Sequence, residues 1–73
     1  MMGPKYPIYE PKFREHGFTY THTVRNLDFY NKEGTGERIE FCPPCNILRH
    51  YDGKKQLSNR VRNFEEYIKT HLK

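Results

Sequence analysis

Residues 18–25 show the pattern that most constrains the fold, a strict alternation between two sets of side chains. Side chains of a β-strand point alternately to opposite faces of a sheet. The segment is also rich in aromatic and β-branched residues, which strands favour. The sequence therefore predicts a strand over residues 18–25 that buries one face. The predicted buried face holds Phe18, Tyr20, His22 and Val24.

The alternation changes parity after this strand, because Leu27 and Phe29 are apolar at odd positions. A slip by one residue turns every following side chain to the other face. We therefore expect a bulge or a turn near Asn26.

A hairpin is predicted next, since the glycine-rich turn at residues 33–36 is followed by a second strand over residues 38–42. Centring this hairpin on Thr35 places Phe29 opposite Phe41. Such a cross-strand aromatic pair would stabilise the sheet.

Residues 46–57 contain a turn signal, Asp52-Gly53, between the segments 47–51 and 54–57. This arrangement makes a second, short hairpin an open alternative for the region.

The C-terminal segment predicts one amphipathic helix near residues 58–72. Its apolar residues are spaced by 4, 3, 4 and 4 positions, which places them in one stripe of a helix. Ser58 is a suitable N-cap. Such a helix is about 24 Å long, enough to cover a small sheet. The stripe consists of Leu57, Val61, Phe64, Ile68 and Leu72.

Together these elements predict a single small α+β domain over residues 13–73: an antiparallel hairpin or meander covered by one C-terminal amphipathic helix. Aromatic rings fill its core, because 11 of the 25 hydrophobic residues are Phe or Tyr and the chain lacks Ala and Trp. Three prolines within residues 1–12 predict an extended arm before the domain. The large side chains of this arm, which we expect to dock on a partner, are Tyr6, Ile8 and Tyr9.

Positive charge is concentrated in the last third of the chain. Residues 1–48 carry six basic and six acidic side chains, whereas residues 49–73 carry seven basic and three acidic ones. Such an asymmetry fits an anionic partner, either nucleic acid or an acidic protein surface, and also fits a merely solvated face. The basic cluster that we predict to contact a partner consists of Arg49, Lys54, Lys55, Arg60 and Arg62.

Few residues favour catalysis. The adjacent Glu65 and Glu66 point about 100° apart on a helix and so cannot converge on one substrate atom. No glycine-rich phosphate loop precedes a helix. The chain is therefore predicted to be a binding protein, not an enzyme, that needs no cofactor and acts as a monomer. It also lacks an apolar run of roughly 18 residues, so we expect a cytoplasmic protein without membrane contact.

Cys42 and Cys45 form the one local motif with chemistry, a C-x-x-C pair. Two cysteines are too few for a secreted disulfide scaffold, so free thiols are expected. The spacing also allows two thiolates to reach one zinc ion, with His50 and His71 completing a tetrahedral set. These spacings match no standard zinc finger, and we therefore predict no metal site, with this set of four as the alternative.

Taken whole, the chain resembles a small transcription regulator of a lytic Xanthomonas phage. The resemblance lies in the 73-residue length, the start MMGPKYPIYEP, the aromatic hairpin, FCPPC and the basic segment RHYDGKKQLSNRVRNF. It implies a protein that binds the β′ subunit of host RNA polymerase, displaces the σ factor and promotes antitermination. It is an overall likeness and assigns a role to no single residue. The alternative function is a small basic nucleic-acid-binding module, with zinc or without it.

Overall fold

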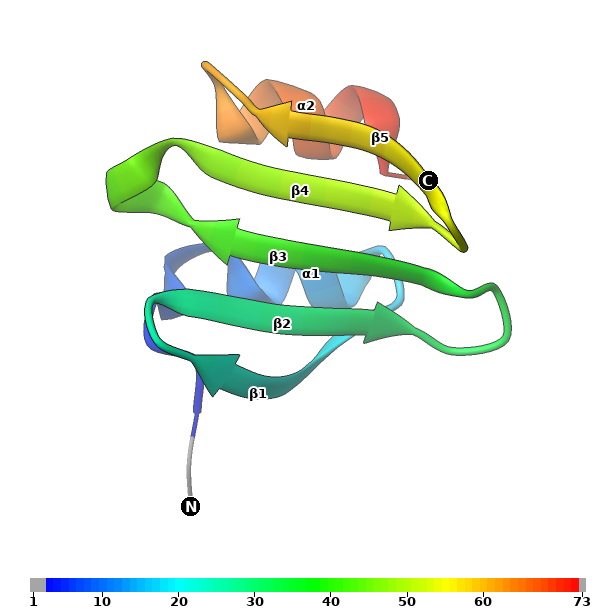
Figure 1. Cartoon of the computed structure of the whole chain (residues 1–73), viewed down its shortest axis with the longest axis horizontal. Coiled ribbons are helices and arrows are strands. Elements are labelled where there is room, and N and C mark those ends of the chain that lie inside the picture. The colour runs from blue at the N-terminus through cyan, green and yellow to red at the C-terminus, as the bar shows by residue number, and fades with distance from the viewer. Residues whose placement is uncertain (1–2, 73) are drawn as a thin grey trace.

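The computed structural model describes residues 3–72 and confirms an α+β fold, with a five-stranded antiparallel sheet and two α-helices (Figure 1). The elements in chain order are the 3-10 turn η1 (Pro7–Tyr9), α1 (Glu10–Glu15), β1 (Phe18–Val24), β2 (Leu27–Lys32), β3 (Glu37–Cys42), the 3-10 turn η2 (Pro43–Cys45), β4 (Ile47–Asp52), β5 (Lys55–Arg60) and α2 (Phe64–His71).

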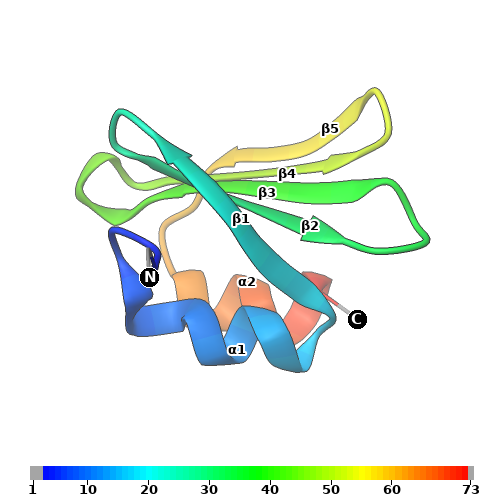
Figure 2. The same ribbon diagram turned by 90° about the horizontal axis from the view of Figure 1, so that it is seen from below.

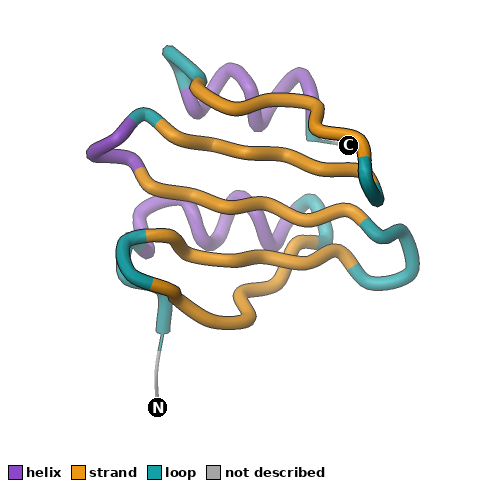
Figure 3. Tube along the Cα trace, viewed as in Figure 1, coloured by secondary structure: helices purple, strands orange, loops and turns teal. Residues whose placement is uncertain are grey.

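Each strand pairs with the next one along the chain, so the sheet has the order β1-β2-β3-β4-β5 (Figure 3). The second hairpin is confirmed, because β4 and β5 pair around a two-residue turn with Asp52 opposite Lys55. Gly53 in that turn has φ 64°, a value that glycine adopts without steric cost.

Both helices cover the same face of the sheet (Figure 2). We call this the inner face and the opposite side the outer face. Within residues 3–72, no helix covers the outer face.

The core lies between the inner face and the two helices, and aromatic rings dominate it as predicted. The Phe13 ring of α1 packs against the rings of Tyr30 (4.7 Å between centroids) and Phe41 (5.2 Å). Phe41 in turn meets Phe64 of α2 at 5.1 Å, edge to face. Aliphatic residues complete the buried cluster, namely Ile39, Leu48, Ile68 and Leu72.

The prediction of an extended arm over residues 1–12 is wrong for its second half, which forms η1 and the start of α1. Pro7 and Pro11 stand in the first turns of these elements, where the missing N–H has no helical partner to lose. The helix then carries Phe13 into the core. Met1 and Met2 of the predicted arm lie outside the described residues.

The predicted buried face of β1 is wrong beyond Tyr20. The pairing of β1 with β2 shifts between Tyr20 and His22, which marks a bulge at Thr21. His22 and Val24 are therefore exposed, while Thr23 turns inward and donates a 2.6 Å hydrogen bond to Asp28. The turn expected near Asn26 is present between β1 and β2.

The predicted pair of Phe29 and Phe41 is wrong by one residue, since Phe29 pairs with Glu40 and Asp28 with Phe41. Four residues, 33–36, form the turn between Lys32 and Glu37, with positive φ at both glycines. This register buries Asp28 and Tyr30 and leaves Phe29 on the outer face, because neighbours in a strand point to opposite sides.

The C-terminal helix is confirmed only over Phe64–His71. Its N-cap is Asn63, whose side chain accepts a 3.0 Å hydrogen bond from the Glu66 amide. The predicted cap, Ser58, lies instead in β5 and donates a 2.6 Å hydrogen bond to the Leu48 carbonyl. Because residues 55–60 use their backbone groups to pair with β4, they are not available to a helix.

None of the helices over residues 3–72 is long and apolar enough to cross a lipid bilayer.

Candidate partner-binding surfaces

The predicted basic cluster does not form one patch, because β5 separates its members. Lys54 and Lys55 lie at the tip of the β4–β5 hairpin, and both are exposed. Arg60 and Arg62 lie at the opposite end of β5. Arg49 lies in the middle of β4, at a distance from both ends. A partner that contacts all five cations must therefore span the length of the β4–β5 hairpin.

The hairpin tip, which we define as Gly53, Lys54 and Lys55, projects from the edge of the sheet (Figure 1). Arg38 of the neighbouring β3 reaches it, since its guanidinium donates a 3.3 Å hydrogen bond to the Gly53 carbonyl. Three cationic side chains and one carboxylate, that of Asp52 opposite Lys55, thus lie at this turn, and the net positive charge can attract an anionic group from solution.

Arg60 and Arg62 line a hollow of about 370 Å³ together with Asn46 and Val61. The Val61 amide donates a 3.0 Å hydrogen bond to the Asn46 carbonyl, which holds the chain after β5 against the turn before β4. Asn46 itself has φ 57°, a left-handed conformation that Asn tolerates better than most residues.

The outer face carries one pair of stacked rings and one cation–π pair. His22 of β1 and Phe29 of β2 lie face to face, 4.6 Å apart and 11° from parallel. The Arg38 guanidinium of β3 lies 4.1 Å from the ring centre of Tyr51 in β4. His22 is exposed, and the other three residues are partly exposed.

A charge network adjoins these two pairs and includes Arg38 of the second pair. The Glu40 carboxylate of β3 lies 3.2 Å from the Arg49 guanidinium and 3.9 Å from that of Arg38. One carboxylate therefore forms ion pairs with two guanidinium groups. Arg49 also donates a 3.1 Å hydrogen bond to Asn59 of β5. The centre of the outer face is therefore charged, ordered by hydrogen bonds, and net positive.

The sequence analysis missed this outer-face set of His22, Phe29, Arg38, Glu40 and Tyr51. Alternation was the signal that could have revealed it, since these residues share one face once the register is known. With Phe29 assigned to the core and no bulge placed at Thr21, two of its members were expected to be buried.

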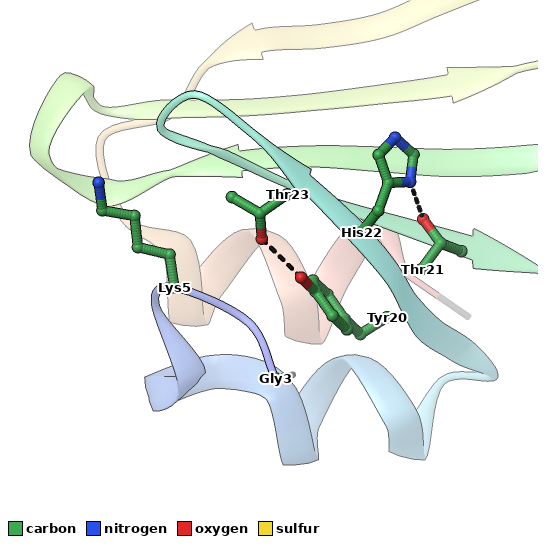
Figure 4. A pocket seen from close by; sticks show the side chains of 6 residues that line it. All are labelled: Gly3, Lys5, Tyr20, Thr21, His22 and Thr23. Atoms are coloured by element: carbon green, nitrogen blue, oxygen red, sulfur yellow. Dashed lines mark hydrogen bonds between the residues drawn. The ribbon is translucent and has the colours of Figure 1, made fainter. Parts of the chain in front are cut away.

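A second hollow, of about 470 Å³, lies beside the bulge of β1 (Figure 4). At this bulge the Tyr20 hydroxyl and Thr23 Oγ1 are 2.6 Å apart, and Thr21 Oγ1 lies 2.8 Å from His22 Nδ1. Figure 4 shows that Tyr20 and His22 point away from each other across the strand. The bulge thus places His22 on the outer face. The lining residues are Gly3, Lys5, Tyr20, Thr21, His22 and Thr23.

The predicted docking residues of the arm differ in their accessibility. Tyr6 and Tyr9 pack against the protein's own core, and only Ile8 is exposed, at 71% of its surface. The backbone amides of Lys5 and Tyr6 donate hydrogen bonds of 2.8 and 2.7 Å to the buried Asp28 carboxylate. Over the described residues, the arm is therefore part of the domain.

The structure does not bring Cys42, Cys45, His50 and His71 together as a metal site. Residues 3–72 contain no group of three or more His, Cys, Asp or Glu side chains placed to hold a metal ion. Cys42 is buried and Cys45 exposed. A hydrogen bond with Cys42 raises the pKa of the Cys45 thiol. This thiol therefore stays protonated at neutral pH and is a weak nucleophile.

His50 is buried and links three elements of the fold through its ring nitrogens. Its Nδ1 lies 2.9 Å from the Tyr67 hydroxyl while its Nε2 lies 3.1 Å from Glu37 Oε1. These contacts join β4 to α2 and to β3. Both ring nitrogens of His50 are therefore engaged by neighbouring side chains.

The chain matches no protein-family model, no curated protein and no solved structure.

Proposed function

We propose that the chain is a transcription regulator that binds RNA polymerase directly and catalyses no reaction. The resemblance to the Xanthomonas phage regulator supports the partner: the β′ subunit of the host polymerase, in the host cytoplasm. On this proposal the bound protein competes with the σ factor at initiation and promotes antitermination during elongation.

The observation that carries the proposal is the exposed hairpin tip. Lys54 and Lys55 stand at the end of a projecting hairpin, and Arg38 donates a hydrogen bond to the same turn. Cations at the rim of an interface mainly steer association, because their field acts before contact. A tip of this kind suits an acidic surface on a protein partner.

The apolar contribution of the arm is smaller than the sequence suggests. Tyr6 and Tyr9 support the core, so Ile8 is the one predicted anchor of the arm that remains accessible. Affinity would then depend on Ile8 and on exposed apolar groups near the hairpin, such as Leu57, which is 44% exposed.

The proposal is tested by titrating fluorescently labelled protein with polymerase core and with holoenzyme, in the absence of nucleic acid. We expect binding to core that added σ factor reduces. The double variant Lys54→Glu/Lys55→Glu should associate at least several-fold more slowly, with a weaker salt dependence and little change in dissociation.

The matched control is Lys12→Glu/Lys69→Glu, which changes the net charge equally but alters exposed residues of the two helices. It should associate nearly as fast as the parent protein. Equal slowing by both double variants would show that net charge alone is responsible and would remove the role of the tip. Binding to neither polymerase form would reject the proposed function.

A further inference from the structure

We propose that the outer face binds single-stranded nucleic acid, with bases stacking beside Phe29 and Tyr51 and phosphates bound by the neighbouring cations. This inference goes beyond the proposed function, which concerns a protein partner and the hairpin tip.

The outer face presents planar groups to solvent. The His22–Phe29 pair is nearly parallel at 4.6 Å, and the Arg38 guanidinium lies 4.1 Å from the Tyr51 ring centre. Such groups provide flat surfaces on which bases stack, whatever their sequence. The two pairs stand on β1–β2 and β3–β4, so Phe29 and Tyr51 are two strands, or roughly 10 Å, apart across the sheet and are offset by two residues, about 7 Å, along the strands. A short single strand can reach both.

The stacking groups have a net positive charge beside them. Arg38 and Arg49 share the single carboxylate of Glu40, which leaves an excess positive charge at the centre of the face. Lys54 and Lys55 add positive charge at the hairpin tip, at one end of β5, where Lys55 lies opposite Asp52. Cations close to stacking groups suit a single strand, in which every base is linked to a phosphate.

The same arrangement disfavours a protein at this face. The centre of a protein interface is usually depleted of charged residues, and here the central strand β3 presents Arg38 and Glu40. A duplex is also disfavoured, because its bases are already stacked on one another and their faces are not free. A single strand leaves the base faces available.

The test is fluorescence anisotropy with labelled oligonucleotides of about ten nucleotides, a length that suits one small domain. Oligo-U and oligo-dT distinguish RNA from DNA, and a duplex of equal length tests strandedness. We expect both single strands to bind more tightly than the duplex at low salt. Phe29→Ala and Tyr51→Ala should each weaken binding roughly 5- to 150-fold, the loss of one stacked base. Tyr51→Phe, which keeps the ring, should bind like the parent.

Thr70→Ala is the control, because Thr70 is an exposed, uncharged residue of α2, the helix that covers the inner face. It should leave oligonucleotide binding unchanged. Arg49→Gln should lower the slope of log K against log salt by about 0.7, the value for one phosphate contact on a single strand.

NMR titration of the unaltered protein gives a readout that no variant's folding can affect. Oligo-U should shift the amide signals of β2, β3 and β4. Three results would overturn the proposal: no oligonucleotide binding at low salt, equal binding by the duplex, or binding that Phe29→Ala and Tyr51→Ala do not change. Outer-face shifts caused by RNA polymerase but not by oligonucleotides would assign the face to protein binding and would also overturn it.

Discussion

The backbone amide of Tyr6 donates a 2.7 Å hydrogen bond to the buried carboxylate of Asp28, 22 residues along the chain. The Lys5 amide and the Thr23 hydroxyl donate to the same carboxylate, at 2.8 and 2.6 Å. Asp28 thus holds the N-terminal segment against the β1–β2 hairpin. A carboxylate is suited to this task because it only accepts hydrogen bonds.

Asp28→Ala should therefore lower the free energy of unfolding by about 2–5 kcal/mol, because it leaves three donors without their acceptor. Denaturant unfolding measures the loss, and hydrogen exchange should show faster exchange at the Tyr6 amide. Asp52→Ala at the exposed end of β4 is the control and should change stability by less than about 0.5 kcal/mol. Similar stability of the two variants would show that the N-terminal segment is not anchored at Asp28.

Phe29 and Phe41 provide a test of the strand register. Phe41 is fully buried, so Phe41→Ala should cost about 3–5 kcal/mol. Phe29 lies on the outer face, and Phe29→Ala should cost only about 1 kcal/mol, mainly the contact with His22. Thermal unfolding of both variants measures the difference. Equal losses would indicate the register that pairs the two rings with each other.

We expect the stability of the fold to fall at alkaline pH because of Tyr30. Its hydroxyl is buried and finds no hydrogen-bond partner among residues 3–72. Burial, then the Asp28 carboxylate, raises the pKa of Tyr30 above its usual value near 10. Above pH 10 the unfolded chain releases this proton while the folded chain retains it. The contribution of this bound proton to the free energy of unfolding is therefore fully present below pH 10. It is lost as pH rises, by up to about 1.4 kcal/mol per pH unit.

Tyr30→Phe removes this titration together with the unpaired hydroxyl. At pH 8 the variant should be as stable as the parent or up to about 1 kcal/mol more stable. By pH 11 its advantage should grow by about 1 kcal/mol. Urea unfolding at the two pH values checks both statements, and an advantage that shrinks with pH would contradict the assignment.

We expect both cysteine thiols to react slowly with alkylating reagents, and we expect the stability of the fold not to depend on zinc. Because its pKa is raised, Cys45 should react with iodoacetamide at pH 7 more slowly than a free peptide thiol, while Cys42 stays protected until unfolding. Mass spectrometry after timed alkylation distinguishes the two sites. Incubation with EDTA should leave the melting temperature unchanged. One zinc ion per chain by elemental analysis, with unfolding in chelator, would contradict this prediction.

Local sequence patterns were sufficient for those elements whose signal needs no distant partner. Alternation identified β1 as far as Tyr20, glycines at positions 34, 36 and 53 marked two turns, and the spacing of Phe64, Ile68 and Leu72 identified α2. In each case backbone sterics or a short periodicity acts within a few residues. The concentration of positive charge near the C-terminus was likewise evident from the sequence.

Tertiary structure decided the rest. The spacing of Leu57 and Val61 fits a helix, yet residues 55–60 become a strand because β4 offers a row of backbone partners. The register of β2 against β3 follows from burying Tyr30 and from placing Asp28 where the N-terminal amides can reach it. This register, shifted by one residue from the predicted one, places Phe29 on the outer face. The bulge at Thr21 places His22 beside it. A period of two residues cannot make this choice by itself, because both registers alternate equally well and only packing against the helices distinguishes them.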